Sequence, residues 1–269
     1  MVNLNRYFVH CTSYINYQPM RAIFLIGLSA LSTAALAQTT SRDQFDPKVT
    51  EFYDLKPEKI TPGATNSDAP SDAIVLFGGK DFNEWTSARD GGAPKWDVKD
   101  GAMTVTKGTG DVKTKKEFRD FQLHIEWRTP SEVVGEGQGR GNSGIFLQGL
   151  YELQVLDSYE SVTYSNGQAG AIYKQEQAVP LVNACKKPGE WQTYDVIFTA
   201  ARFGKGGRMI IPAYVTVLQN GVLIQAHTAI TGPTEYKGLP VYKEIDKGPL
   251  QLQDHGNPVS YRNIWIREL

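Results

Sequence analysis

Cysteine is almost absent from this sequence, with only Cys11 and Cys185 among 269 residues. If a leader before residue 38 is removed, Cys185 stands alone. The sequence therefore offers no intrachain disulfide, no cysteine-rich zinc site and no Cys–His pair with a known spacing. Cys185 is expected to be a small packed residue.

An excess of charge of either sign is also missing, because the formal net charge is −1. Such a chain has no electrostatic footprint for nucleic acid or for an anionic membrane surface, and neither is expected as a partner. The sequence contains no G-x-S-x-G, no H-E-x-x-H and no P-loop. Serine hydrolase, zinc protease and NTPase functions therefore lack support.

The single long apolar run, at 22–36, is too short to cross a membrane comfortably. It follows a basic Met20-Arg21 start and ends in the small-residue pattern Ala35-Leu36-Ala37. These features predict a secretory signal peptide near 20–37, with 1–19 as an N-terminal extension or Met20 as the true start. We expect a periplasmic or extracellular protein that has no membrane attachment after cleavage.

A helical repeat of apolar residues is missing as well. Instead, 26 glycines and 14 prolines separate about a dozen short runs of β character. Asp100-Gly101 and Asn220-Gly221 are strong hairpin signals. The pattern predicts an all-β fold, a two-sheet antiparallel jelly-roll sandwich, over 71–269. An extended leader is expected at 38–70, and the oligomeric state is not predicted.

The most informative stretch is 142–158, which predicts two short strands joined by a tight turn at Gly149-Leu150. Alternation puts two sets of residues on opposite faces of the second strand: Tyr151, Leu153 and Val155 on one, and Glu152, Gln154 and Leu156 on the other. The polar set indicates either an ordinary solvated strand or the floor of a polar groove.

Two further strands have a polar face. The run 121–128 places Gln122, His124, Glu126 and Arg128 together, and the run at 251–255 places Gln251, Gln253 and His255 together. Three such strands could line one groove, in which Glu and Gln side chains would suit sugar hydroxyls. Tyr173 with Lys174, and Trp191, are candidate platforms for a sugar ring, or simply core residues.

Two shorter motifs leave their roles open. Asp254-His255 at a strand end fits an oriented general base, a metal site or a capped turn. Gly139 to Gly144 matches G-x-G-x-x-G, but a strand rather than a helix follows, so a dinucleotide site is not expected. This glycine-rich segment is interpreted as a mobile loop in which Arg140 and Asn142 could bind a ligand.

Several blocks together resemble one family. They are L-F-G-G-K-D-F-N-E-W at 76–85, D-F-Q-L-H-I-E-W-R at 120–128, G-N-S-G-I-F at 141–146, Y-E-L-Q-V-L-D at 151–157, A-I-Y at 171–173, L-V-N-A-C-K-K-P-G-E-W-Q-T-Y-D at 181–195 and G-P-L-Q-L-Q-D-H-G-N-P-V-S-Y-R-N-I-W-I at 248–266. Over roughly 73–269 the chain resembles the 3-keto-disaccharide hydrolase family. The resemblance implies a curved jelly roll of the concanavalin-like lectin and glucanase type, with a groove on its concave face and a carbohydrate substrate.

A 3-keto glycoside suggests an elimination mechanism. The ketone acidifies the C2 proton, a base removes it, the C1 substituent leaves, and water adds to the enone; the enolate oxygen must be held meanwhile. The predicted catalytic residues are Glu152, His255 oriented by Asp254, and Glu126. The predicted substrate-binding residues are Arg128, Arg140, Asn142, Gln154, Tyr173 and Gln253, among which Arg128, Arg140 and Gln154 could hold the enolate.

Other mechanisms and functions stay open at this point. Direct hydrolysis by the carboxyls of Glu126 and Glu152 is the rival mechanism. No cofactor is predicted, and a divalent metal held by His255 and carboxylates is the alternative. The chain could instead be a carbohydrate-binding module without chemistry, or a structural protein of the cell envelope that binds no sugar.

Overall fold

The computed structural model describes residues 46–269, so the predicted signal peptide at 20–37 lies outside the described residues. The chain divides into two compact units after Pro57. The described part of the first unit contains one turn of 3-10 helix, η2 (Pro47–Thr50), whose N-terminal Lys48 N–H is capped by Asp46. The second unit, Glu58–Leu269, carries the sheets.

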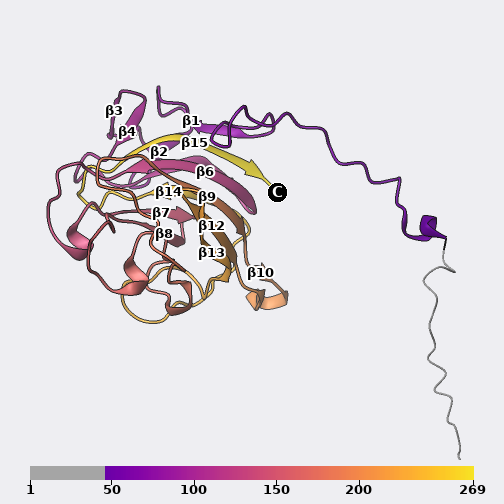
Figure 1. The fold of residues 1–269 in the computed structure, drawn as a ribbon. Helices are drawn as coiled ribbons and strands as arrows, with labels where there is room; N and C mark the ends of the chain where they lie inside the picture. Colours follow the sequence, from indigo (N-terminus) through magenta and orange to yellow (C-terminus); the bar gives the residue numbers. More distant parts are fainter. Residues whose placement is uncertain (1–45) are drawn as a thin grey trace, which may run out of the picture. The chain divides into compact units, whose positions relative to one another are not determined.

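The second unit is built from two antiparallel sheets. The larger one has eight strands in the order β13-β12-β9-β6-β15-β4-β3, with β1 also paired to β15, and the smaller one has the order β2-β5-β14-β7-β8. Figure 1 shows the larger sheet curving around the strands β14, β7 and β8. The all-β, jelly-roll prediction is confirmed, and no helix of the described residues is long and apolar enough to cross a membrane.

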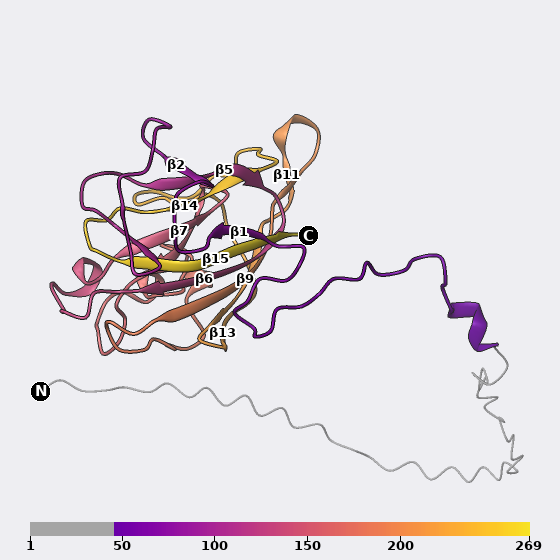
Figure 2. The ribbon, with the colours of Figure 1, turned by 90° about the horizontal axis from the view of Figure 1, so that it is seen from above.

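The strands of the larger sheet are β1 (Ile74–Phe77), β3 (Asp97–Lys99), β4 (Ala102–Thr104), β6 (Phe121–Arg128), β9 (Gln192–Thr199), β12 (Tyr214–Gln219), β13 (Val222–Ala229) and β15 (Ser260–Glu268). Those of the smaller sheet are β2 (Trp85–Ser87), β5 (Val112–Phe118), β7 (Ser143–Leu147), β8 (Tyr151–Val155) and β14 (Gly248–Leu252). A separate hairpin, β10 (Arg202–Phe203) with β11 (Met209–Ile211), projects from the sandwich in Figure 2. Single 3-10 turns occur in the loops: η3 (Gly137–Gly139), η4 (Ser165–Gly167), η5 (Glu176–Ala178) and η6 (Lys205–Gly207).

The core lies between the two sheets and is filled by every second residue of the long strands. On β6, β8 and β9 these residues are fully buried: Leu123, Ile125, Trp127, Tyr151, Leu153, Val155, Tyr194, Val196 and Phe198. The ring of Tyr151 packs 5.7 Å from that of Phe198 across the sheets. Each such side chain stabilises the fold by roughly 1.5–3 kcal/mol. The residues between them must point away from the core, so Glu126 on β6 and Glu152 on β8 lie on opposite outer faces of the sandwich.

The hairpin turns follow the sequence closely. Asp100-Gly101 and Asn220-Gly221 have the positive φ angles that a two-residue hairpin turn requires. The turn between β7 and β8 lies one residue earlier than predicted, because Gln148 and Gly149 have φ angles of 53° and 66°. Leu156 also departs from its predicted outer position: it follows the end of β8 and is buried in the core.

Part of the predicted leader packs onto the larger sheet. The carbonyl of Ser67 accepts hydrogen bonds from the indole of Trp265 (3.0 Å) and the amide of Asn263 (2.9 Å), both on β15. This contact covers the outer face of the larger sheet near β6. On the polar face of β6, His124 (1% exposed) and Glu126 are buried, whereas Gln122 and Arg128 are half-buried. The middle of this strand therefore does not line an open groove as the sequence suggested.

Candidate functional site on the smaller sheet

A row of side chains crosses the outer face of the smaller sheet. Strand register places Lys113 of β5 opposite Gln251 of β14, Gln251 opposite Phe146 of β7, and Phe146 opposite Glu152 of β8. The row continues beyond the last strand to Tyr173, because Ile172 bridges Leu153 and the Tyr173 N–H donates to the Glu152 carbonyl (3.0 Å). Residues opposite one another share a face, so this row aligns basic, amide, acidic and phenolic groups.

A second row runs beside the first. Gly144 lies opposite Gln154, and the Gln253 N–H donates to the Gly144 carbonyl (3.0 Å). Gln154 and Gln253 each have a buried side-chain oxygen with no hydrogen-bond partner among the described residues. Buried polar atoms without a partner are uncommon, and two of them on either side of a glycine are suited to accept hydrogen bonds from sugar hydroxyls.

Asp111 is a second carboxylate on this face and was not identified from the sequence. Its oxygens accept hydrogen bonds from the Gln251 amide (2.8 Å) and the Asp254 N–H (2.9 Å). Asp111 directly precedes β5. This strand was not predicted from the sequence, because Val112–Phe118 loses its alternation in a run of charged residues. The only available signal was the single alternation at the start of that strand.

Glu152 has the most unusual environment of this surface. Glu152 is only 5% exposed. A Cβ at Gly144 of β7 would lie 2.6 Å from Oε1 of Glu152, so the carboxyl occupies space that only a glycine at this position leaves free. Among residues 46–269 no donor lies within hydrogen-bond distance of this carboxyl. Burial, together with the negative charge of Asp111, raises the pKa of Glu152 to about 8. A carboxyl with such a pKa can transfer protons near neutral pH.

A cluster of three tyrosines and a lysine flanks Glu152. The hydroxyls of Tyr164 and Tyr173 are 2.5 Å apart, and the ammonium of Lys174 lies 4.9 Å, 5.9 Å and 5.2 Å from the ring centres of Tyr164, Tyr173 and Tyr236. Burial raises the pKa of Tyr173, and so does its hydrogen bond with Tyr164. The phenol of Tyr173 therefore stays protonated and remains a hydrogen-bond donor at neutral pH. The hydroxyl of Tyr173 is directed at that of its neighbour Tyr164, and a role of the Tyr173 ring as a platform for a sugar stays a prediction.

Three side chains that were predicted to bind a ligand form hydrogen bonds or ion pairs within the protein instead. Arg140 forms an ion pair with the buried Asp157 (2.6 Å). The amide of Asn142 donates to the carbonyl of Gln138 (2.6 Å), and the amide of Gln154 donates to the side chain of Gln138 (3.0 Å). These donors hold the glycine-rich loop against β8, so we correct the expectation that they are free for substrate. Among the described residues, the side-chain oxygens of Asn142 and Gln154 have no hydrogen-bond partner.

Asp254 does not orient His255. Its two oxygens accept hydrogen bonds from the N–H groups of Gly110 (2.9 Å) and Gly256 (3.0 Å), which is the capped turn that the sequence left open. His255 is exposed next to this turn. A proton-transfer role for His255 therefore has no support from an Asp254 contact.

Glu126 and Arg128 belong to the opposite face of the sandwich. Burial would raise the pKa of Glu126, but hydrogen bonds from Asn263 (2.9 Å) and Arg262 (2.6 Å) outweigh it and hold this pKa below its usual range. Arg128 and Arg262 lie 4.6 Å and 4.1 Å from the centre of the Trp191 ring, which is thus covered rather than open to a sugar. Because the core separates the two faces, Glu126 and Glu152 cannot act as a pair.

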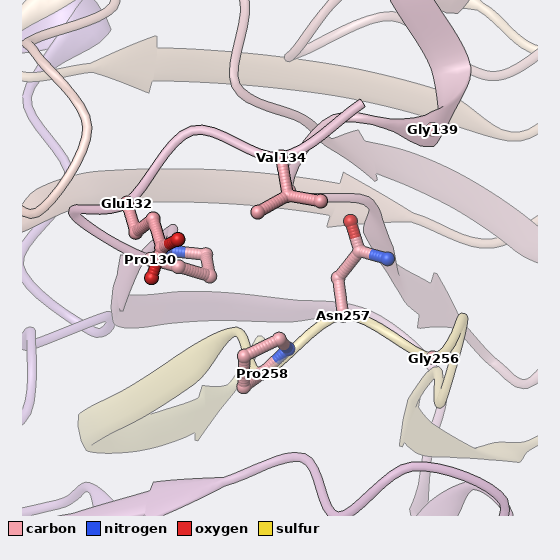
Figure 3. A pocket seen from close by; sticks show the side chains of 8 residues that line it. Pro130, Glu132, Val134, Gly139, Gly256, Asn257 and Pro258 are labelled. Carbon is pink, nitrogen blue, oxygen red and sulfur yellow. The ribbon is translucent and has the colours of Figure 1, made fainter. Parts of the chain in front are cut away.

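A pocket of about 240 Å³ opens at the end of the sandwich, beside the glycine-rich loop. Figure 3 shows Val134 and Asn257 reaching toward each other, with Glu132 and Pro130 on one side. Glu132 is the only ionisable residue of its lining. The pocket therefore lacks the paired proton-transfer groups of the sheet face. In residues 46–269, no group of three His, Cys, Asp or Glu side chains is placed to hold a metal ion.

Comparison with known proteins gives a consistent result. The family model of the 3-keto-alpha-glucoside-1,2-lyase-like domain matches residues 72–267. A Bacteroides thetaiotaomicron protein named 3-keto-disaccharide hydrolase is 27% identical over 236 residues, which cover 73% of this chain and 78% of that protein.

Two crystal structures from Parabacteroides distasonis, both described as candidate glycosyl hydrolases, are similar to this chain. The first is 54% identical with a TM-score of 0.79, covering 83% of this chain and 97% of that chain. The second is 23% identical with a TM-score of 0.55, covering 78% of this chain and 100% of that chain, and supports the fold alone.

Proposed function

Because this chain belongs to the 3-keto-alpha-glucoside-1,2-lyase-like family, we propose that it cleaves 3-keto glycosides on the outer face of the smaller sheet, with Glu152 as the base. A glycoside hydrolase-like role is supported by the names of its relatives. The observation that carries the residue assignment is the Glu152 carboxyl, buried without a hydrogen-bond donor and with its pKa raised to about 8. A base of this strength suits the removal of a carbon-bound proton that a ketone has acidified.

The proposed reaction has three steps. The ionised Glu152 carboxyl takes the proton from C2, and the electron pair of that C–H bond forms the C2–C3 double bond of an enolate. The enolate collapses, the C1–O bond breaks, and the protonated Glu152 returns the proton to the leaving oxygen. Water then adds its hydroxyl to C1 and a proton to C2, so that the sum is hydrolysis. The free oxygens of Gln154 and Gln253 accept hydrogen bonds from sugar hydroxyls.

Two parts of this proposal rest on the sequence. The signal peptide expected near 20–37 supports action in the periplasm or outside the cell. His255, exposed beyond β14, is the second candidate for proton transfer to the leaving oxygen.

The test is incubation of the purified protein with a 3-keto-disaccharide and with its unoxidised parent in deuterated water, followed by mass spectrometry. We expect cleavage of the keto sugar only, with deuterium at C2 of the product. Glu152→Gln should abolish turnover, and Glu117→Gln, which changes an exposed carboxyl of β5, should not. His255→Ala measures the contribution of the second candidate.

Other outcomes point elsewhere. Cleavage of the parent sugar would overturn elimination in favour of direct hydrolysis. Binding of either sugar without cleavage would indicate the alternative function, a carbohydrate-binding module without chemistry.

A further inference from the structure

The elimination reaction places negative charge on the oxygen at C3, and this charge needs a hydrogen-bond donor. None of the donors expected from the sequence is free on the face of Glu152. Arg128 lies on the opposite sheet, the Arg140 guanidinium is paired with Asp157, and the Gln154 amide donates to Gln138. The donor must therefore be another group near Glu152.

Tyr173 is placed correctly for this task. The bridge between Leu153 and Ile172 sets Tyr173 directly opposite Glu152, and residues in such positions have Cβ atoms about 5 Å apart. A base that acts at C2 and a donor that acts on the C3 oxygen must contact neighbouring carbons of one sugar ring. Two adjacent side chains on one face of a sheet meet this requirement.

The hydroxyl pair leaves one donor unused. Tyr164 and Tyr173 each carry one hydroxyl proton, and a single hydrogen bond of 2.5 Å joins their oxygens. If Tyr164 donates to Tyr173, the proton of Tyr173 is free to point at a ligand. A hydroxyl that already accepts a hydrogen bond is also polarised into a stronger donor.

Lys174 adds a positive charge behind this pair. Lys174 is exposed, its ammonium lies within 6 Å of the ring centres of Tyr164, Tyr173 and Tyr236, and it has no carboxylate within 4.0 Å among the described residues. Its backbone has a φ of 66°, uncommon for a residue other than glycine, and is held there by a hydrogen bond from its N–H to the Asn166 carbonyl (2.9 Å). Backbone strain of this kind clusters at functional sites.

We propose that the hydroxyl of Tyr173, supported by Tyr164 and by the charge of Lys174, holds the enolate oxygen at C3 of the keto sugar. This proposal rests on the proposed function, since it names the group that stabilises the intermediate formed when Glu152 removes the C2 proton. Tyr173 contacts the substrate, whereas Tyr164 and Lys174 are positioning residues. The site thereby selects a sugar with a carbonyl at C3, because a hydroxyl there could not become an enolate.

The test compares turnover of the 3-keto-disaccharide by the full-length protein and its variants. Tyr173→Phe should lower kcat by about 100-fold with KM little changed, which is the typical loss for one oxyanion donor. Tyr164→Phe should lower kcat by about tenfold. Lys174→Gln should do the same, and Lys174→Arg, which keeps the charge, should restore most of the loss. Tyr214→Phe, on β12 of the other sheet, is the matched control.

Thermal melting shows whether each variant is folded, and the two tyrosine variants test the same hydroxyl pair independently. If the wild type is active and both folded variants, Tyr173→Phe and Tyr164→Phe, keep its kcat, this assignment is overturned and the proposed function stays intact. A wild type that neither cleaves the keto sugar nor exchanges deuterium into C2 would overturn the proposed function itself. A Lys174→Arg variant as impaired as Lys174→Gln would show that charge at this position is not what matters.

Discussion

Replacing Glu152 by Gln should stabilise the protein relative to the wild type, and this difference should grow as the pH rises, although the replacement removes the proposed base. In the folded state burial raises the pKa of Glu152 from its ordinary 4.5 to about 8. The unfolded chain therefore releases this proton at lower pH than the folded chain, and the wild type loses stability as the pH rises from about 4.5 to about 8. The glutamine side chain does not ionise and escapes this loss.

The size of the effect follows from the width of that pH window. Each pH unit inside it costs the folded wild type about 1.4 kcal/mol, which amounts to about 3 kcal/mol at pH 7. At about 2–4 °C per kcal/mol for a domain of this size, the Tm of Glu152→Gln should exceed that of the wild type by about 6–12 °C at pH 7. At pH 4.5 most of this difference should vanish.

The assay is thermal unfolding followed by circular dichroism at half-unit steps from pH 4.5 to pH 9. Subtracting the two curves cancels the titrating groups that do not interact with Glu152, and Glu117→Gln supplies the control for the loss of an exposed charge on the same sheet. A difference in Tm between wild type and Glu152→Gln that stays constant from pH 4.5 to pH 8 would refute the raised pKa, and with it the argument for Glu152 as a base.

Four further predictions follow from the same geometry. The kcat/KM of the wild type should rise about tenfold per pH unit up to about pH 8 and then level off, as Glu152 must be ionised to act; a falling limb there in the pH profile of kcat/KM would assign it as the acid instead. Gly144→Ala should lower kcat at least about tenfold, because its new Cβ displaces the Glu152 carboxyl; steady-state kinetics on the folded variant checks this. Arg140→Ala should destabilise the protein by about 3–5 kcal/mol in urea unfolding, since it leaves Asp157 buried and unpaired. Arg128→Ala should leave kcat/KM within about twofold, and a larger loss would place substrate on the wrong face.

Much of the fold could be predicted because its signals are local. Alternation in 121–128 and 151–155 is a property of consecutive residues, and Asn220-Gly221 fixes its hairpin turn by backbone preference alone. β5 was missed for the same reason, because Glu117 and its lysine neighbours interrupt the alternation while pairing with β14 and β2 holds the strand.

The site was only half predictable, because alternation shows which residues share a face within one strand but not which face of the sandwich that is. Glu126 and Glu152 alternate in the same way, yet the core lies between them. The partners of Glu152 come from other segments: Asp111 lies three strands away, and Tyr173 joins β8 through a bridge that no local pattern announces. Similarly, the hydrogen bond that Asp254 accepts from the N–H of Gly110 joins residues that are 144 positions apart in the sequence.

The central claim is that chemistry takes place on the face of the smaller sheet that carries Glu152. Its most direct test is kcat/KM for a 3-keto-disaccharide with two single variants, Glu152→Gln and Glu126→Gln, in which the same chemical change is made on opposite faces. We expect Glu152→Gln to lose about 100-fold to 10,000-fold, the range for a general base, and folded Glu126→Gln to stay within about tenfold of the wild type. The reverse ranking would contradict the account, because it would place the reacting sugar against β6 on the larger sheet.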